Sequence, residues 1–96
     1  MIEYENYGKL ESLAELENAI EMGLDIEFLL YDTRYNISWR DNKPFICECP
    51  EGVAKFFDTS ELLLQRYEVG DNPLKSLWGD MKILYLVSYR RNSISN

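Results

Sequence analysis

The sequence predicts an α+β fold: an N-terminal helix packed on an antiparallel β-meander, then a second helix, a short helical turn and a C-terminal strand. Several sequence patterns lead to this prediction. A helix start signal precedes an apolar stripe with helical spacing in residues 12–22. Segments with alternating side chains follow in residues 26–49, joined by short polar turns. Another helix start signal near residue 58 and an apolar run in residues 82–89 complete the pattern.

The first helix is expected to begin at Ser12. The spacing of Ser12 and Glu15 is that of a capping box, in which the hydroxyl and the carboxylate bind free amides of the first turn. Gly23 supplies a residue that readily adopts the left-handed conformation at a helix end. The apolar stripe consists of Leu13, Leu16, Ala19 and Ile20. Acids line the outward side: Glu11, Glu15, Glu17 and Glu21.

Alternation assigns two faces to each strand of the meander, because successive side chains of a strand point to opposite sides. The first strand has Ile26, Phe28 and Leu30 on one face and Glu27, Leu29 and Tyr31 on the other. The second and third strands carry an aromatic and thiol face made of Tyr35, Ile37, Trp39, Phe45, Cys47 and Cys49. We expect this face to pack under the helix, with turns at residues 32–33 and 41–44.

The second half of the chain predicts shorter elements. Residues 53–57 form a short extended piece, and a helix capped by Asp58 or Thr59 runs to about Arg66. Pro73 occupies a first-turn position of a short helix that Gly79 closes. Residues 82–89 form a strand with apolar residues on both faces, expected as a central or terminal strand of a monomer or at the interface of a homodimer.

The composition predicts one domain, residues 1–96, with residues 89–96 as a flexible tail. Because 46% of the 96 residues are apolar, the chain can build a core without metals or disulfides. No apolar run has the roughly 20 residues needed to span a bilayer, and the N-terminus lacks the features of a secretory signal. The expected location is cytoplasmic, with no membrane partner.

The sequence argues against an enzyme and against a bound cofactor. It has no His, no P-loop, no dinucleotide fingerprint and no nucleophile elbow. Cys47 and Cys49 are expected to stay free and buried, because residues two apart in a strand are separated by about 6.5–7 Å, at or beyond the upper end of disulfide geometry. With no third Cys, a zinc site lacks ligands. A pI near 4.5 disfavours direct binding to nucleic acid.

The charge imbalance lies in the first 27 residues, which hold eight acids and one base, Lys9, whereas residues 28–96 hold nine of each. We therefore expect an electrostatic partner, a protein with a basic surface, to dock at this end. The expected contact residues are Glu11, Glu15, Glu17, Glu21, Asp25 and Glu27, with Tyr4, Tyr7 and Tyr31 as aromatic anchors. The alternative is a small bacterial regulatory or structural subunit whose acidity serves only solubility.

A resemblance rests on the order of short segments between residues 12 and 83. After the first helix come three segments: Asp25-Ile26-Glu27-Phe28, Tyr35-Asn36-Ile37 and Phe57-x-x-x-Glu61-Leu62-Leu63. The last segment runs from Leu74 to Ile83 and includes Leu74-Lys75-Ser76-Leu77-Trp78-Gly79-Asp80. This pattern resembles a group of small uncharacterised proteins of Gram-positive bacteria and their phages. Gly70 lies further from Leu74 than in that group.

The resemblance implies an α+β fold and an origin on a mobile element, and it carries no activity. Small acidic phage proteins often occupy a nucleic-acid site on a host protein, where carboxylates stand in for phosphates. The resemblance thus implies an inhibitor of a host nucleic-acid-binding or defence protein, of the anti-CRISPR type.

Overall fold

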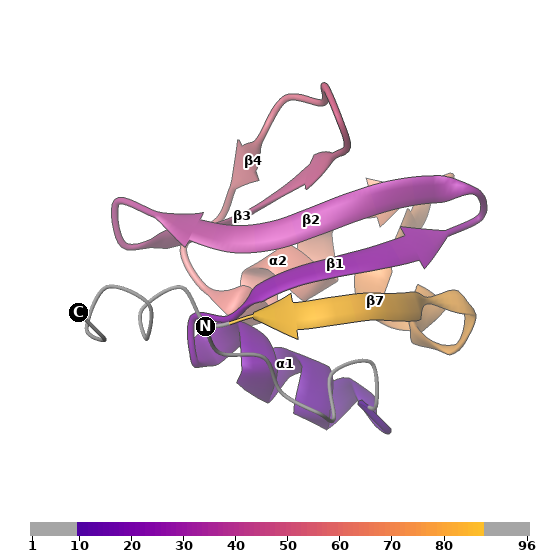
Figure 1. Cartoon of the computed structure of the whole chain (residues 1–96), viewed down its shortest axis with the longest axis horizontal. Coiled ribbons are helices and arrows are strands. Elements are labelled where there is room, and N and C mark those ends of the chain that lie inside the picture. The colour runs from indigo at the N-terminus through magenta and orange to yellow at the C-terminus, as the bar shows by residue number, and fades with distance from the viewer. Residues whose placement is uncertain (1–9, 88–96) are drawn as a thin grey trace.

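The computed structural model describes residues 10–87, which form one five-stranded antiparallel sheet with the helices on one of its faces (Figure 1). The strand order is β4-β3-β2-β1-β7. The elements are α1 (Leu13–Glu21), β1 (Asp25–Leu30), β2 (Thr33–Arg40), β3 (Lys43–Glu48), β4 (Lys55–Phe56), α2 (Ser60–Arg66), β5 (Glu68–Val69), β6 (Asn72–Pro73), the 3₁₀ helix η1 (Leu74–Asp80) and β7 (Lys82–Val87). The predicted α+β class is confirmed.

The start of α1 follows the capping box with one difference. The Ser12 hydroxyl accepts a hydrogen bond from the Glu15 amide at 3.1 Å, as predicted. The Glu15 carboxylate accepts from the amide of Glu11, at 2.7 Å, one residue before the predicted donor. At the other end, Gly23 has a φ of 83°, so the predicted left-handed residue is confirmed.

The meander is built from three strands in strict register. Ile26 of β1 lies opposite Ile37 of β2, which lies opposite Ile46 of β3. The turns between the strands are two residues long, and both residues of each have positive φ, as in type I′ turns. The first turn is Tyr31-Asp32, one residue earlier than predicted, and the second is Asp41-Asn42.

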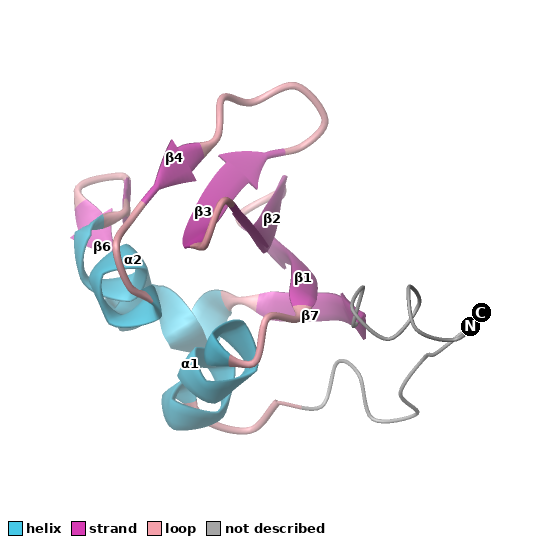
Figure 2. Cartoon of the chain, turned by 90° about the vertical axis from the view of Figure 1, so that its left-hand side faces the viewer, coloured by secondary structure: helices cyan, strands magenta, loops and turns pink. Residues whose placement is uncertain are grey.

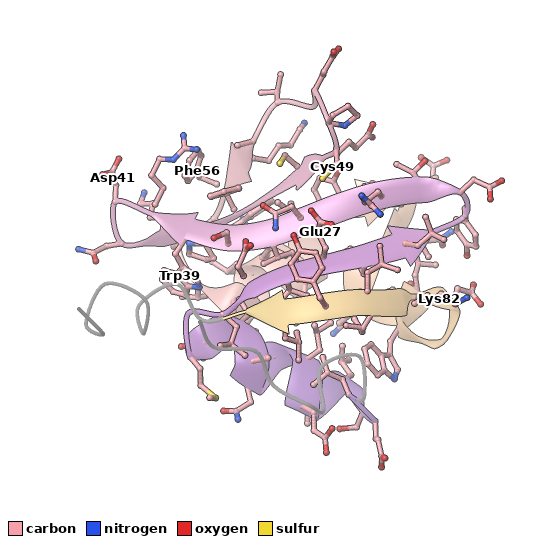
Figure 3. All side chains as sticks on the ribbon, in the orientation of Figure 1. Glu27, Trp39, Asp41, Cys49, Phe56 and Lys82 are labelled. Carbon is pink, nitrogen blue, oxygen red and sulfur yellow. The ribbon has the colours of Figure 1, made fainter. Side chains whose placement is uncertain are left out.

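The prediction that the cysteines and Phe45 lie under the helix is wrong. Directly opposed residues of an antiparallel pair share a face. Cys47 lies opposite Asn36 and Phe45 opposite Ser38, so these residues occupy the face away from the helices. Figure 3 shows Cys49 and Glu27 on this side. The alternation of faces within the third strand was predicted correctly. The prediction was wrong about which of these two faces lies on the same side of the sheet as Tyr35, Ile37 and Trp39 of the second strand.

The helix layer closes the other face of the sheet (Figure 2). The Thr59 hydroxyl caps α2 by accepting from the Leu62 amide at 3.0 Å, which confirms one of the two predicted caps. Pro73 immediately precedes η1 and belongs to the small β5–β6 ladder, which the sequence analysis did not predict. The buried core residues of this layer are Leu16, Ala19, Ile20, Leu63, Leu64, Leu74 and Leu77.

β7 is the terminal strand of the sheet and pairs antiparallel with β1, one of the two positions predicted for it within a monomer. A register irregularity between Glu27 and Phe28 places Tyr85 opposite Glu27 and Ile83 opposite Phe28. At the other edge, β4 falls within the short extended piece predicted for residues 53–57. Residues 88–96, including the predicted tail, lie outside the described residues.

Both tryptophans are half-buried and pack against the core cluster. The indole N–H of Trp39 donates to the backbone carbonyl of Ile20 at 2.7 Å and so ties β2 to the end of α1. Replacing Trp39 by Phe should lower the free energy of unfolding by about 1–2 kcal/mol, from one hydrogen bond and part of the ring contact.

Trp78→Phe is the matched control, since the Trp78 indole N–H makes no hydrogen bond to a residue in 10–87. Urea unfolding followed by far-UV circular dichroism measures both variants. Equal losses in the two variants would contradict a specific contribution from the Trp39–Ile20 hydrogen bond.

Candidate functional site

The predicted partner-binding acids fall on two different surfaces. Four of them lie in or just before α1: Glu11, Glu15 and Glu21 are exposed, and Glu17 is half-buried. The other two, Asp25 and Glu27, belong to β1 and lie on the sheet face turned away from the helices. The structure therefore does not bring the six acids together.

The helix acids gain a neighbour from α2 that the sequence analysis did not include. Glu17 and Glu61 line one shallow hollow of about 140 Å³, together with Lys75 of η1. We call Glu11, Glu15, Glu17, Glu21 and Glu61 the acidic helix surface. The ion pairs within residues 10–87 are Arg34–Glu27 and Lys43–Asp58, so none involves the acidic helix surface.

Glu21 has a structural contact that explains its place at the end of α1. An acid near a helix C-terminus is unfavourable for the helix dipole. The Glu21 carboxylate, however, accepts a hydrogen bond from the hydroxyl of Ser60, the fully buried first residue of α2. This contact joins the end of one helix to the start of the next, and only the tertiary structure reveals it.

The opposite side of the sheet is polar at its centre. One row of side chains crosses four strands, because each residue lies directly opposite the next. The row consists of Tyr85 of β7, Glu27 of β1, Asn36 of β2 and Cys47 of β3. Asp25 lies two residues before Glu27 on the same face. We call these five residues the polar sheet face.

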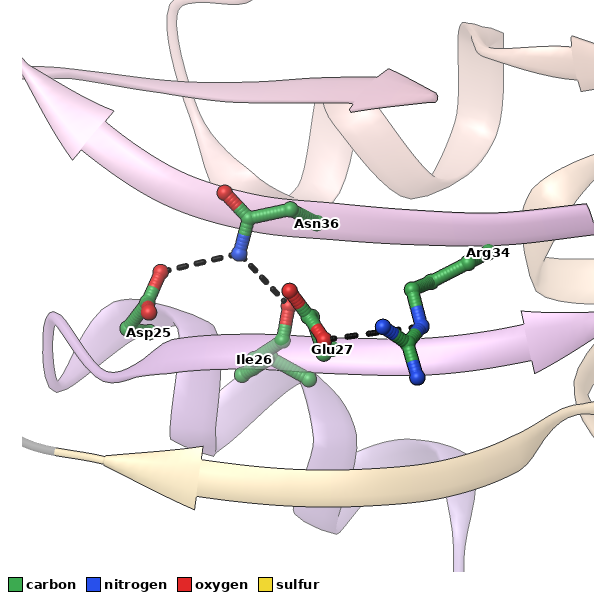
Figure 4. A network of polar contacts seen from close by, with 5 residues as sticks. All are labelled: Asp25, Ile26, Glu27, Arg34 and Asn36. Atoms are coloured by element: carbon green, nitrogen blue, oxygen red, sulfur yellow. Dashed lines mark hydrogen bonds and ion pairs between the residues drawn. The ribbon is translucent and has the colours of Figure 1, made fainter. Parts of the chain in front are cut away.

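A hydrogen-bonded network fixes the polar sheet face (Figure 4). The Asn36 amide donates to the Asp25 carboxylate at 2.9 Å and to the Ile26 carbonyl at 3.1 Å. Arg34 lies beside the Glu27 carboxylate, with Nε and Oε1 3.7 Å apart. Asp25 is only 5% exposed, whereas the Arg34 side chain is largely exposed. The carboxylates are thus held in place by neighbours on the adjacent strand.

A groove of about 450 Å³ runs over this face. Its lining includes the five residues of the polar sheet face and, further along, Ser38, Trp39, Arg40, Phe45, Glu48, Cys49 and Pro50. The guanidinium of Arg40 lies over the rings of Phe45 and of the 42% exposed Phe56, at 5.2 and 5.8 Å from their centroids. The sequence alternation placed Glu27 on the face opposite Ile26, but it gave no sign of the groove.

Of the predicted tyrosine anchors, Tyr31 is within the described residues. Tyr31 is 56% exposed, in the turn after β1, and its hydroxyl donates to Asp80 at 2.6 Å. This hydrogen bond, with some burial and the charge of Asp80, raises the pKa of Tyr31 above its ordinary value. Tyr4 and Tyr7 lie outside the described residues.

The cysteines are free and half-buried on the sheet face. Burial is the main cause that raises the pKa of both thiols, and the charges of Asp25 and Glu27 add to it. Within residues 10–87, no group of three or more metal-binding side chains is close enough together to hold a metal ion. The groove therefore offers fixed carboxylates, amides and thiols rather than a reactive thiolate.

Comparisons with protein-family models, with curated proteins and with solved structures found no match to this chain. In residues 10–87, the helices are too short and too polar to cross a membrane.

The raised thiol pKa values predict slow alkylation of the native protein. Iodoacetamide reacts with the thiolate, so a raised pKa lowers the reactive fraction at a given pH and moves the rate profile to higher pH. The rates of Cys47 and Cys49 between neutral and alkaline pH should be measured by mass spectrometry, in native protein and in urea. A native profile at lower pH than the unfolded one would mean that Arg34 and Arg40 outweigh burial.

Proposed function

We propose that this protein is a cytoplasmic, non-enzymatic binding module that docks its acidic helix surface against a basic surface of another protein. The observation that carries the proposal is the unpaired acidity of that surface. The ion pairs within residues 10–87 lie elsewhere on the molecule, and none of them involves the five carboxylates of this surface. The surface therefore retains its charge for a partner.

The arrangement of these carboxylates supports recognition by several weak contacts. Glu11 and Glu15, and likewise Glu17 and Glu21, are four residues apart, a spacing of about 5–6 Å between Cβ atoms where the chain is helical. An exposed ion pair contributes only about 0.2–1 kcal/mol, so affinity requires several pairs together and an apolar anchor. Such a surface mainly accelerates association, since charge complementarity steers the encounter.

A narrower form of the proposal concerns the kind of partner. Spaced carboxylates on a rigid helix present negative charge as a phosphate backbone does, so a nucleic-acid-binding protein offers the matching Lys and Arg groups. Together with the resemblance to phage proteins, this favours an inhibitor of a host defence or nucleic-acid-binding protein, of the anti-CRISPR type. The alternative is a regulatory or structural subunit whose acidity serves only solubility.

The test begins with capture of the tagged protein's partner from its host and measurement of the association rate at several salt concentrations. A fourfold variant, Glu11→Gln, Glu15→Gln, Glu17→Gln and Glu21→Gln, should slow association about tenfold or more and flatten the salt dependence. Glutamine keeps an acceptor oxygen for the Glu11 amide and for Ser60, so the contacts of Glu15 and Glu21 can persist.

The matched control makes the same change in net charge elsewhere on the molecule. The control variant changes four exposed acids outside the helices: Asp32→Asn, Glu51→Gln, Glu68→Gln and Asp71→Asn. If the control slows association as much as the helix variant, net charge alone is responsible. If neither variant changes the rate, the acidity serves only solubility.

A further inference from the structure

We propose that the groove over the polar sheet face seats an arginine side chain of a partner protein, with its guanidinium against Asp25 and Glu27. This site lies on the opposite side of the sheet from the acidic helix surface. It does not depend on the function proposed above, and the two can be tested separately.

The first argument is the environment of Asp25. Asp25 as a residue is only 5% exposed, yet its carboxylate has no ion-pair partner within residues 10–87 and accepts one hydrogen bond there, from Asn36 to Oδ1. Burying a carboxylate without a cation is costly. No fully buried side-chain oxygen or nitrogen in the described part lacks a hydrogen-bond partner. Oδ2, which has no donor there, is therefore not fully buried, and Asp25 belongs to the lining of the groove.

The second argument is the charge of the groove. The lining holds three carboxylates, of Asp25, Glu27 and Glu48, and one guanidinium, of Arg40. That guanidinium is engaged with the rings of Phe45 and Phe56. Arg34, outside the lining, already pairs with Glu27 at 3.7 Å, so the lining acids without an ion pair in residues 10–87 are Asp25 and Glu48, and a cation complements their charge.

The third argument selects arginine over lysine. A guanidinium is planar and donates several N–H groups in a fixed fork, which suits two carboxylates held on one strand. Asp25 and Glu27 are two residues apart on β1, so they lie about 6.5–7 Å apart along the strand. Tyr85, opposite Glu27, is also part of the lining of the groove. The network of Asn36 and Arg34 already holds the carboxylates, so little order is lost on binding.

The experiment titrates ¹⁵N-labelled protein with the peptide acetyl-Gly-Arg-Gly-amide and follows amide chemical shifts. The matched probe replaces arginine by citrulline, which has the same shape without the charge. We expect the arginine peptide to shift the amides of Asp25, Glu27, Asn36 and Cys47, and the citrulline peptide to leave them unchanged. Asp25→Asn should weaken binding at least about tenfold, the loss expected for a charge-assisted hydrogen bond. Asp71→Asn, with the same charge change at an exposed position outside both surfaces, should have no effect.

Glu27→Gln is the second variant, for the case in which Asp25→Asn does not fold, and it too should weaken binding. Equal responses to both peptides, shifts centred on α1, or full binding by the folded variants would each overturn the proposal. Arg90 and Arg91 of this chain are tested as the alternative source of the arginine. The double variant Arg90→Ala, Arg91→Ala is measured without peptide. If it shifts the amide signals of Asp25 and Glu27 in the direction opposite to the shifts that the peptide causes, an arginine of the chain itself occupies the groove and the proposal fails.

Discussion

The register of the β1–β2–β3 meander is the constraint on which the rest of the structure depends. Ile26, Ile37 and Ile46 lie opposite one another across three strands, and each is fully buried beneath the helices. Fully burying such a side chain contributes about 1.5–3 kcal/mol. A slip by one residue would turn a strand's apolar set to the wrong face, so this row determines which side chains meet the core and which meet solvent.

The polar sheet face follows directly from that register. Once the isoleucines point to the helices, their neighbours Asp25, Asn36 and Cys47 must point away. The face is not covered by another element within residues 10–87, and its polar groups bind one another instead of a core. A carboxylate can be buried there because an amide on the next strand is placed to donate to it, although this does not neutralise its charge.

The helix layer depends on contacts between elements that are distant in sequence. The Trp39 indole binds the last turn of α1, and the Ser60 hydroxyl binds Glu21 at the same end of that helix. Both contacts hold α1 to its neighbours near its C-terminus, and the acids of its outer side take part in no ion pair within residues 10–87. The structure thus carries negative charge on two separated surfaces: the helix acids are mostly exposed and outside the ion pairs within residues 10–87, whereas on the sheet Asp25 is buried and hydrogen-bonded and Glu27 pairs with Arg34.

The sequence by itself determined the order of the main helices and strands, the Ser12 cap, two candidate caps for α2, the meander turns to within two residues and the apolar stripe of α1, because capping, alternation and helical spacing are local properties. It also located the acidic residues that make up most of the candidate surfaces. Only the tertiary structure decided the phase of β3, and hence that Cys47 faces Asn36 rather than the helix, because register depends on which strand faces oppose one another. It likewise decided that Glu21 meets Ser60 and that Asp25 and Glu27 lie apart from the helix acids, since a strand that follows a helix presents alternate residues to opposite sides of the sheet.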